Sequence, residues 1–194
     1  DINSKFTNSI DVLPIVDEVN RLVSVVLKNE DGFSIDGRAI SENSPAFIIA
    51  EIGNNHNGDI ELAKKLVDLA FDSGADCVKF QMRDVASLYQ LSGESNGSAD
   101  LGAEYTLDLL SKFQLTNQQL FDVFDYCKSK GLPPLCTPWD INSLGALEEY
   151  GMDFYKVASA DLTNHVFLEA LINTGKPLIC STGMSTEIEI RKSA

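Results

Sequence analysis

From residue 46 onward, short apolar segments alternate with longer stretches in which apolar residues recur every three or four positions. The short segments predict five strands, because strands buried on both faces are almost continuously apolar: residues 47–52, 76–81, 132–137, 153–158 and 177–181. The longer stretches predict amphipathic helices over residues 60–72, 117–130, 142–150, 164–174 and 186–193. This alternation indicates an α/β protein with a parallel sheet covered by helices.

Polar and small residues mark the ends of the predicted helices. Asp59 and Thr116 carry side chains that cap helix N-termini. Glycines that accept a left-handed backbone precede the next strands: Gly74, Gly131, Gly151 and Gly175. The first helix is expected to turn Leu62, Leu66, Leu69 and Ala70 toward the sheet, and the second Leu120, Val123, Phe124 and Cys127.

The first 45 residues follow a different pattern. Residues 10–27 form two β-rich segments around a polar turn at 17–21, which predicts a hairpin. This stretch resembles the closing part of a CBS module, and a small β cap or linker hairpin fits it equally well. Residues 29–44 are rich in Gly, Asp, Asn and Ser, and predict a linker with a short hairpin at 33–40. We therefore expect a CBS-like or hairpin segment at 1–28, a linker at 29–45 and the main domain at 46–194.

The position of polar residues distinguishes two parallel-sheet folds. A (β/α)8 barrel gathers functional groups at the carboxyl ends of all its strands, whereas an open doubly wound sheet concentrates them at one switch point. Here every predicted strand ends in polar groups, at Glu51, Gln81, Thr137, Ser159 and Ser181. This favours a TIM-type barrel, of which about 150 residues would be the N-terminal part, with roughly five of the eight strands.

Composition narrows the classes of partner. The chain has 194 residues with 15 Lys and Arg against 29 Asp and Glu, a net charge of -14. An acidic surface disfavours contact with nucleic acid or anionic membranes, so a bound anion is expected in a focused pocket. The four cysteines, Cys77, Cys127, Cys136 and Cys180, lack zinc-ligand spacing and lie in apolar segments. This predicts buried, reduced thiols in a cytoplasmic protein.

Lys79 and Lys156 carry the first chemical signal, since each lies within an apolar strand. An unpaired buried ammonium is costly, so each lysine needs an anion. Three interpretations remain open: a structural salt bridge with a carboxylate such as Glu51, a clamp for phosphate or carboxylate, and a Schiff-base amine. Hydroxyl groups from Thr137, Ser159 and Ser181 would add neutral donors to a clamp.

The segment after the first strand is dense in functional groups. Glu51 ends an apolar strand, where a carboxylate must be paired or used. His56 lies five residues later, and the other histidine, His165, is at a helix start that favours a capping or surface role. Two such separated histidines predict no metal site within this chain.

Five ordered motifs carry a family resemblance. They are FIIAEIGNNHNG at Phe47–Gly58, VKFQ at Val78–Gln81, CTPWD at Cys136–Asp140, YKVASADLTN at Tyr155–Asn164 and STGMS at Ser181–Ser185. In order and spacing they resemble the sialic acid synthase family. That family condenses phosphoenolpyruvate with an N-acetylated amino-sugar aldose, such as N-acetylmannosamine, on a (β/α)8 barrel, and forms a nonulosonic acid and phosphate with C–O cleavage.

The resemblance implies roles for individual residues. The substrate-binding group would be Lys79, Thr137, Lys156, Ser159 and Ser181 for phosphoenolpyruvate, with Gln81 on the sugar. Glu51, Lys156 and Asp161 would be the catalytic residues. Asp161 departs from the pattern, since many members have Glu there. The resemblance also implies a divalent cation, Mn²⁺ or Mg²⁺, with ligands beyond Ala194, a homodimer, and an inactive isolated fragment. A Schiff-base aldolase and a non-catalytic protein that binds phosphorylated ligands remain the alternatives.

Overall fold

A five-stranded parallel sheet forms the main body of the protein. The computed structural model describes residues 12–16, 22–27, 33–41, 43–88 and 109–194. The strands lie side by side in chain order: β5 (Ile49–Gly53), β6 (Cys77–Met82), β7 (Pro134–Pro138), β8 (Tyr155–Val157) and β9 (Leu178–Cys180). All five predicted strands are confirmed. Because the order never reverses, the sheet corresponds to five consecutive strands of a (β/α)8 barrel, not to a doubly wound sheet.

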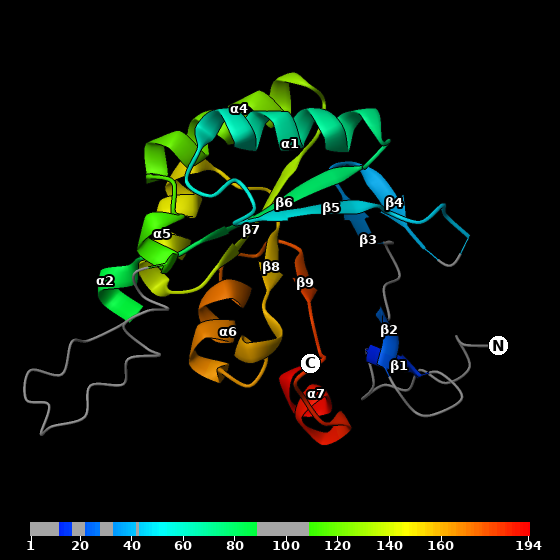
Figure 1. Ribbon diagram of the computed structural model, residues 1–194. Coiled ribbons are helices and arrows are strands. Elements are labelled where there is room, and N and C mark those ends of the chain that lie inside the picture. Colours follow the sequence, from blue (N-terminus) through cyan, green and yellow to red (C-terminus); the bar gives the residue numbers. More distant parts are fainter. Residues whose placement is uncertain (1–11, 17–21, 28–32, 42, 89–108) are drawn as a thin grey trace, which may run out of the picture.

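Helices follow the strands and lie along one side of the curved sheet (Figure 1). They are α1 (Ile60–Asp72), α2 (Val85–Leu88), α4 (Asn117–Ser129), α5 (Ile141–Tyr150), α6 (His165–Ile172) and α7 (Glu187–Ser193), with a 3₁₀ turn η2 (Ser159–Asp161). The five predicted helices are present, and the short helices α2 and η2 were not predicted. Figure 1 shows α1 and α4 side by side, and the two helices are in contact.

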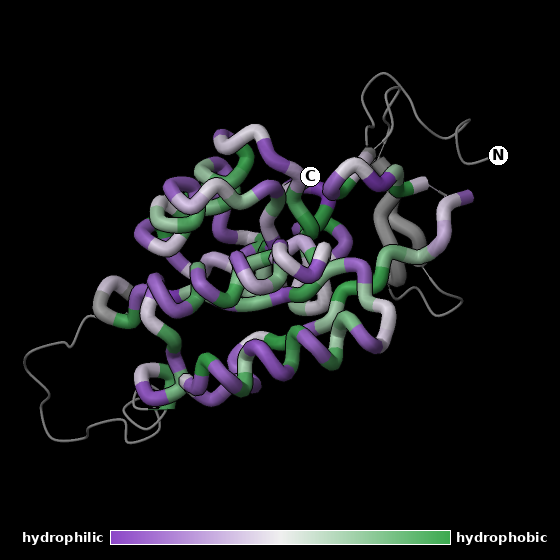
Figure 2. Tube along the Cα trace, turned by 90° about the horizontal axis from the view of Figure 1, so that it is seen from above, coloured by the Kyte–Doolittle hydropathy of each residue, from purple (hydrophilic) through white to green (hydrophobic). Residues whose placement is uncertain are grey.

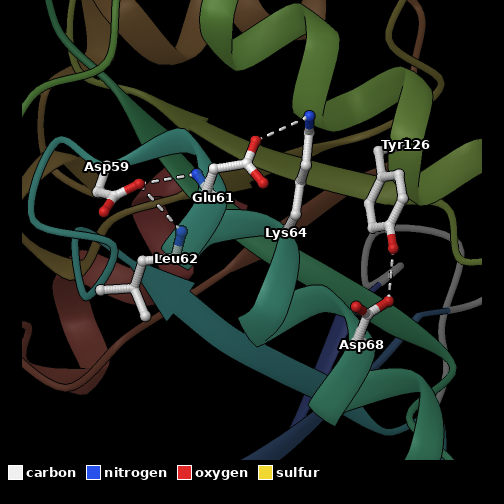
Figure 3. A network of polar contacts seen from close by, with 6 residues as sticks. All are labelled: Asp59, Glu61, Leu62, Lys64, Asp68 and Tyr126. Atoms are coloured by element: carbon white, nitrogen blue, oxygen red, sulfur yellow. Dashed lines mark hydrogen bonds and ion pairs between the residues drawn. The ribbon is translucent and has the colours of Figure 1, made fainter.

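The predicted helix ends are confirmed by hydrogen bonds and backbone angles. The Asp59 carboxylate accepts from the backbone N–H groups of Glu61 and Leu62 at 2.8 and 3.2 Å (Figure 3). Thr116 forms a capping box with Gln119 at the start of α4. All four glycines before strands have positive φ, between 69° and 86°. Figure 3 also shows the Tyr126 hydroxyl donating to Asp68, a 2.7 Å bond that ties α4 to α1.

The larger core lies between the helices and the sheet. From α4 it takes all four predicted residues, Leu120, Val123, Phe124 and Cys127. The prediction for α1 is wrong at Leu69, which is 61% exposed, whereas Ala63, Val67 and Ala70 are buried. The helix is rotated so that Ala63, Val67 and Ala70 meet the sheet. Figure 2 shows polar and apolar positions alternating along the helices.

The opposite face of the sheet, here called the inner face, carries a smaller apolar cluster. It contains Cys77, Leu135 and Phe154, with Ile49 and Ile179 packed beside them. Ile35 from the hairpin β3 (Phe33–Ile35) and β4 (Arg38–Ile40) joins this cluster. The hairpin predicted at 33–40 is therefore confirmed, and it covers the amino-terminal end of the inner face. Arg38 anchors it through an ion pair with Asp76.

The N-terminal hairpin is also confirmed. Strands β1 (Val12–Val16) and β2 (Leu22–Leu27) pair in antiparallel fashion. Their predicted turn at 17–21 lies outside the described residues, and the likeness to a CBS module stays a prediction.

The prediction of four buried cysteines is wrong at one position. Three cysteines are buried as predicted, but Cys180 is exposed, because it lies at the end of the edge strand β9. Within the described ranges, no helix has the length and apolar character needed to cross a membrane.

Candidate functional site

Strand alternation brings the predicted site residues to one face. In β6, Val78 and Phe80 pack against the helices, so Lys79 points to the inner face. The same alternation turns Glu51, Gln81, Thr137 and Lys156 to that side. The strand register also makes them neighbours, since Glu51 in β5 pairs with Lys79 in β6, and Gln81 in β6 pairs with Thr137 in β7. The polar group therefore lies on the carboxyl-terminal side of the apolar inner cluster.

Lys79 and Glu51 form an ion pair. The Lys79 Nζ lies 2.5 Å from Glu51 Oε2, and the Lys79 side chain is only 10% exposed while that of Glu51 is 57% exposed. The structural salt bridge, one of three interpretations of the strand lysines, is thus confirmed for Lys79. An exposed partner leaves this pair open to solvent on one side, where an incoming anion could also reach the ammonium group.

Lys156 has a different environment. Its Nζ donates to the Val157 carbonyl at 2.5 Å, and in the described part of the chain it makes no ion pair. Burial, followed by repulsion from Lys79, lowers the pKa of Lys156. Two cations therefore face one carboxylate, which leaves a local positive excess within an acidic protein.

Two buried oxygen atoms point to ligand contacts. Among the described residues, Thr137 Oγ1 and Asp161 Oδ2 are the buried side-chain atoms without a hydrogen-bond partner. Thr137 is 2% exposed, so its hydroxyl is cut off from bulk water. An unpaired buried polar atom costs about 1–3 kcal/mol, which a ligand would recover. The other Asp161 oxygen accepts from Asn164 at 3.3 Å.

The remaining predicted residues lie at the carboxyl ends of β8 and β9. Ser159 begins η2 and Ser181 follows β9, and both are partly buried. The Ser181 N–H donates to the Val157 carbonyl at 3.1 Å, which extends the β8–β9 ladder to this point. The structure thus places both hydroxyls at the correct end of the sheet, although it records no hydrogen bond from either to the lysines.

Sequence reasoning missed three residues beside the site. Arg83 follows β6, and its guanidinium lies 4.4 Å from the centre of the Trp139 ring. Both side chains donate to Gln81 Oε1. Gly53 has φ +53°, and a Cβ there would lie 2.8 Å from Glu51 Oε1 and 3.2 Å from Gln81 Nε2. The sequence signal that could have identified them is the position of an arginine, a tryptophan and a glycine at the carboxyl ends of predicted strands.

Cavities open next to this network at the ends of β6 and β7. One of about 300 Å³ is bordered by Arg83, Gln114 and Asn142, and another of about 350 Å³ by Trp139, Asn164 and Phe167. Asn142 lies in both walls, and its amide donates to Asp84 at 2.7 Å. The surroundings of the site are therefore hollow, with polar side chains in both walls and the aromatic rings of Trp139 and Phe167 in the second.

A metal does not fit the described residues on their own. Within the described ranges, no group of three or more His, Cys, Asp or Glu side chains could hold an ion. His56 is buried, and its Nδ1 accepts from the Gly58 N–H at 3.1 Å. The imidazole therefore stabilises the turn after β5 through this hydrogen bond. Burial lowers the pKa of His56. His165 is the first residue of α6 and exposed, in line with its predicted position at a helix start.

Comparison with known proteins agrees with this geometry. The sequence pattern of the NeuB family matches residues 66–194. The chain belongs to the NeuB family. It is 36% identical to an N,N'-diacetyllegionaminic acid synthase of Campylobacter jejuni over 155 residues, which cover 75% of this chain and 45% of that protein. It is 31% identical to an N-acetylneuraminate-9-phosphate synthase of Mus musculus, over 77% of this chain and 42% of that protein.

A solved structure shares the fold. The sialic acid synthetase of Leptospira borgpetersenii, in complex with citrate, superposes with a TM-score of 0.73 at 28% identity. The match covers 83% of this chain and 53% of that one. The chain thus spans less than half the length of the two curated relatives and about half of the solved one.

Proposed function

We propose that this NeuB-family chain supplies the phosphoenolpyruvate-binding part of a nonulosonic acid synthase. The observation that carries the proposal is the inner face of the sheet, which bears Lys79, Lys156 and the buried, unpartnered hydroxyl of Thr137. Phosphoenolpyruvate carries a phosphate and a carboxylate, and both are ligands for ammonium groups and hydroxyl donors.

The two lysines would have different roles in substrate binding. Lys156 makes no ion pair in the described part of the chain, so it can take the anion without giving up a carboxylate. Lys79 would keep Glu51 beside the substrate through the 2.5 Å pair. Thr137, Ser159 and Ser181 would complete the group as hydroxyl donors. Charge that develops in the transition state would then meet donors already in place.

The proposed reaction is the one that the family resemblance implies. C3 of phosphoenolpyruvate would attack the open-chain aldehyde of an N-acetylated amino sugar, water would add at C2, and phosphate would leave with cleavage of the C–O bond. Glu51 and Asp161 would be the acids that exchange protons, and Gln81 would contact the sugar. The unpartnered Asp161 Oδ2 supports a ligand contact there.

Other parts of the proposal depend on the whole protein. The divalent cation, with ligands expected beyond Ala194, and the homodimer remain predictions from the resemblance. We also keep 1–28, 29–45 and 46–194 as the proposed division of the chain. The identity of the sugar remains a proposal too, since similar relatives are named for legionaminic, neuraminic and pseudaminic acids.

Calorimetric titration of phosphoenolpyruvate into this chain tests the binding step. Lys156→Met should weaken binding at least about tenfold, because a charge-assisted contact is lost. Lys64→Met is the matched control, since it also removes one positive charge but lies on α1 in a surface pair with Glu61. Equal binding by both variants would overturn the assignment of Lys156. In the full-length protein, phosphate release with N-acetylmannosamine and a divalent cation tests turnover.

One observation favours a second candidate, a Schiff-base aldolase. The lowered pKa of Lys156 favours the neutral amine that attacks carbonyl groups. Borohydride reduction in the presence of pyruvate separates the two candidates. A stable adduct at Lys156, seen as a mass increase, supports the aldolase, whereas an unmodified lysine in a protein that releases phosphate supports the synthase.

A further inference from the structure

The Gln81 side chain is held by two donors. The Arg83 guanidinium donates to Gln81 Oε1 at 2.5 Å, and the Trp139 indole N–H donates to the same oxygen at 3.2 Å. Arginine and tryptophan side chains only donate hydrogen bonds. The group that faces them must therefore be the amide oxygen, which settles the orientation of the Gln81 amide.

The opposite side of the amide faces the candidate site. Gln81 Nε2 lies 3.2 Å from the position that a Cβ on Gly53 would occupy, and Glu51 Oε1 lies 2.8 Å from the same position. A donor and an acceptor thus border the space that glycine leaves free. A reversed amide would present an oxygen beside the Glu51 carboxylate, and two acceptors would repel each other.

The two donors are themselves fixed. The Arg83 guanidinium stacks over the Trp139 ring at 4.4 Å, within range of a cation–π interaction. The Trp139 backbone N–H donates to the Met82 carbonyl at 3.0 Å, and the Arg83 carbonyl accepts from the Gln114 side chain. Contacts to β6 and to the segment before α4 therefore hold both residues in place.

We propose that Arg83 and Trp139 are positioning residues that aim the Gln81 amide N–H₂ at an acceptor oxygen of the aldose. A neutral donor next to a carboxylate suits an uncharged oxygen, such as a sugar hydroxyl or the carbonyl of an N-acyl group, and not the anionic groups of phosphoenolpyruvate. The inference deepens the proposed function and rests on it. It predicts that this pair affects sugar binding and leaves phosphoenolpyruvate binding unchanged.

The first experiment needs no substrate. Trp139 is the single tryptophan of this chain, so its indole N–H gives one signal in a ¹⁵N-correlated spectrum. Gln81→Ala should shift this signal, because it removes the acceptor. Tyr126→Phe, which removes the hydroxyl bonded to Asp68 on α1, should leave the signal in place. An unmoved indole signal in Gln81→Ala overturns the proposed contact, whatever the function of the protein.

The second experiment measures kinetics in the full-length protein with N-acetylmannosamine and phosphoenolpyruvate. Trp139→Phe keeps an aromatic ring at this position but loses the N–H. We expect KM for the sugar to rise about fivefold and KM for phosphoenolpyruvate to stay unchanged. Gln81→Glu still accepts hydrogen bonds from Arg83 and Trp139 but cannot donate one to the sugar. We expect it to raise KM for the sugar about tenfold or more.

A double variant separates positioning from independent binding. If Trp139 acts through Gln81, Trp139→Phe should add nothing in a Gln81→Ala background. A further fivefold rise in that background, or a change in KM for phosphoenolpyruvate, overturns the inference. Failure of the proposed function is distinguishable, because it appears as an absence of phosphate release in the unchanged protein while the indole signal still responds to Gln81→Ala.

Discussion

Replacement of Gly53 by alanine probes both the backbone and the candidate site. Gly53 ends β5 with φ +53°, a left-handed conformation that side chains disfavour. An alanine Cβ would also lie 2.8 Å from Glu51 Oε1 and 3.2 Å from Gln81 Nε2. Both neighbours are ends of flexible side chains, so they can move away. Their movement would disturb the Lys79–Glu51 pair and the Gln81 amide.

The magnitude follows from two contributions. The left-handed backbone costs about 1–2 kcal/mol for a residue with a Cβ. Disturbance of the ion pair adds about 1 kcal/mol at most, because Glu51 is 57% exposed and solvent screens the pair. We therefore expect the free energy of unfolding to fall by about 1–3 kcal/mol. For a chain of this length each kcal/mol lowers Tm by about 2–4 °C.

Gly74→Ala is the matched control. Gly74 has φ +74° after α1, and a Cβ there would meet no heavy atom within 4 Å. This variant should show only the backbone cost. Chemical denaturation of both variants, together with calorimetric titration of phosphoenolpyruvate, separates the two contributions. Gly53→Ala should weaken phosphoenolpyruvate binding several-fold, whereas Gly74→Ala should bind like the unchanged protein. Equal loss of stability and equal binding in the two variants would refute the reasoning.

Three other changes have expected outcomes. Thr137→Val should raise the free energy of unfolding by about 1 kcal/mol, because it removes a buried hydroxyl without a partner. It should also weaken phosphoenolpyruvate binding about tenfold. Denaturation measures the first effect and calorimetry the second, and unchanged affinity would exclude the hydroxyl from the site. Because burial and Lys79 lower the pKa of Lys156, an anion that binds there should raise that pKa, so binding should take up protons and weaken as pH rises through the lowered pKa. Calorimetry in buffers of different ionisation enthalpy measures this uptake, and Lys156→Met should abolish it. Iodoacetamide should modify the exposed Cys180 in the folded protein, whereas burial raises the pKa of Cys127 to about 12 and the buried thiols should react only after unfolding; peptide mass mapping checks the order.

The sequence predicted the element order because that order depends on local chemistry. Strands β5 to β9, helices α1 and α4 to α7, the caps at Asp59 and Thr116, and the glycines before the strands were all found from periodicity and residue type. The error at Leu69 shows the limit of this reasoning. Periodicity identifies an apolar face, but the packing of Ala63, Val67 and Ala70 against the sheet selects the rotation of α1.

For the candidate site, the sequence identified residue types and the structure decided their partners. Strand lysines, the strand-end hydroxyls and Glu51 could be named from residue type alone, because charge in an apolar strand requires a partner. The sequence could not decide which lysine is paired. Only the β5–β6 register places Glu51 opposite Lys79 and leaves Lys156 with a backbone carbonyl. Tertiary structure therefore decides which strand lysine forms a salt bridge and which donates to a backbone carbonyl.

The contacts of Gln81 likewise depend on tertiary structure and not on local sequence. Neighbouring residues in the sequence gave no reason to join Arg83 to Trp139, which lie 56 positions apart in the chain. The next residues of the same two loops also meet, since the Asp84 N–H donates to the Asp140 carboxylate. The parallel pairing of β6 with β7 brings these two strand ends together. Local sequence thus determined where strands, helices and polar groups occur, since each depends on a few adjacent residues. Tertiary structure decided which polar groups meet, because hydrogen bonds and ion pairs across strands depend on register and on the curvature of the whole sheet.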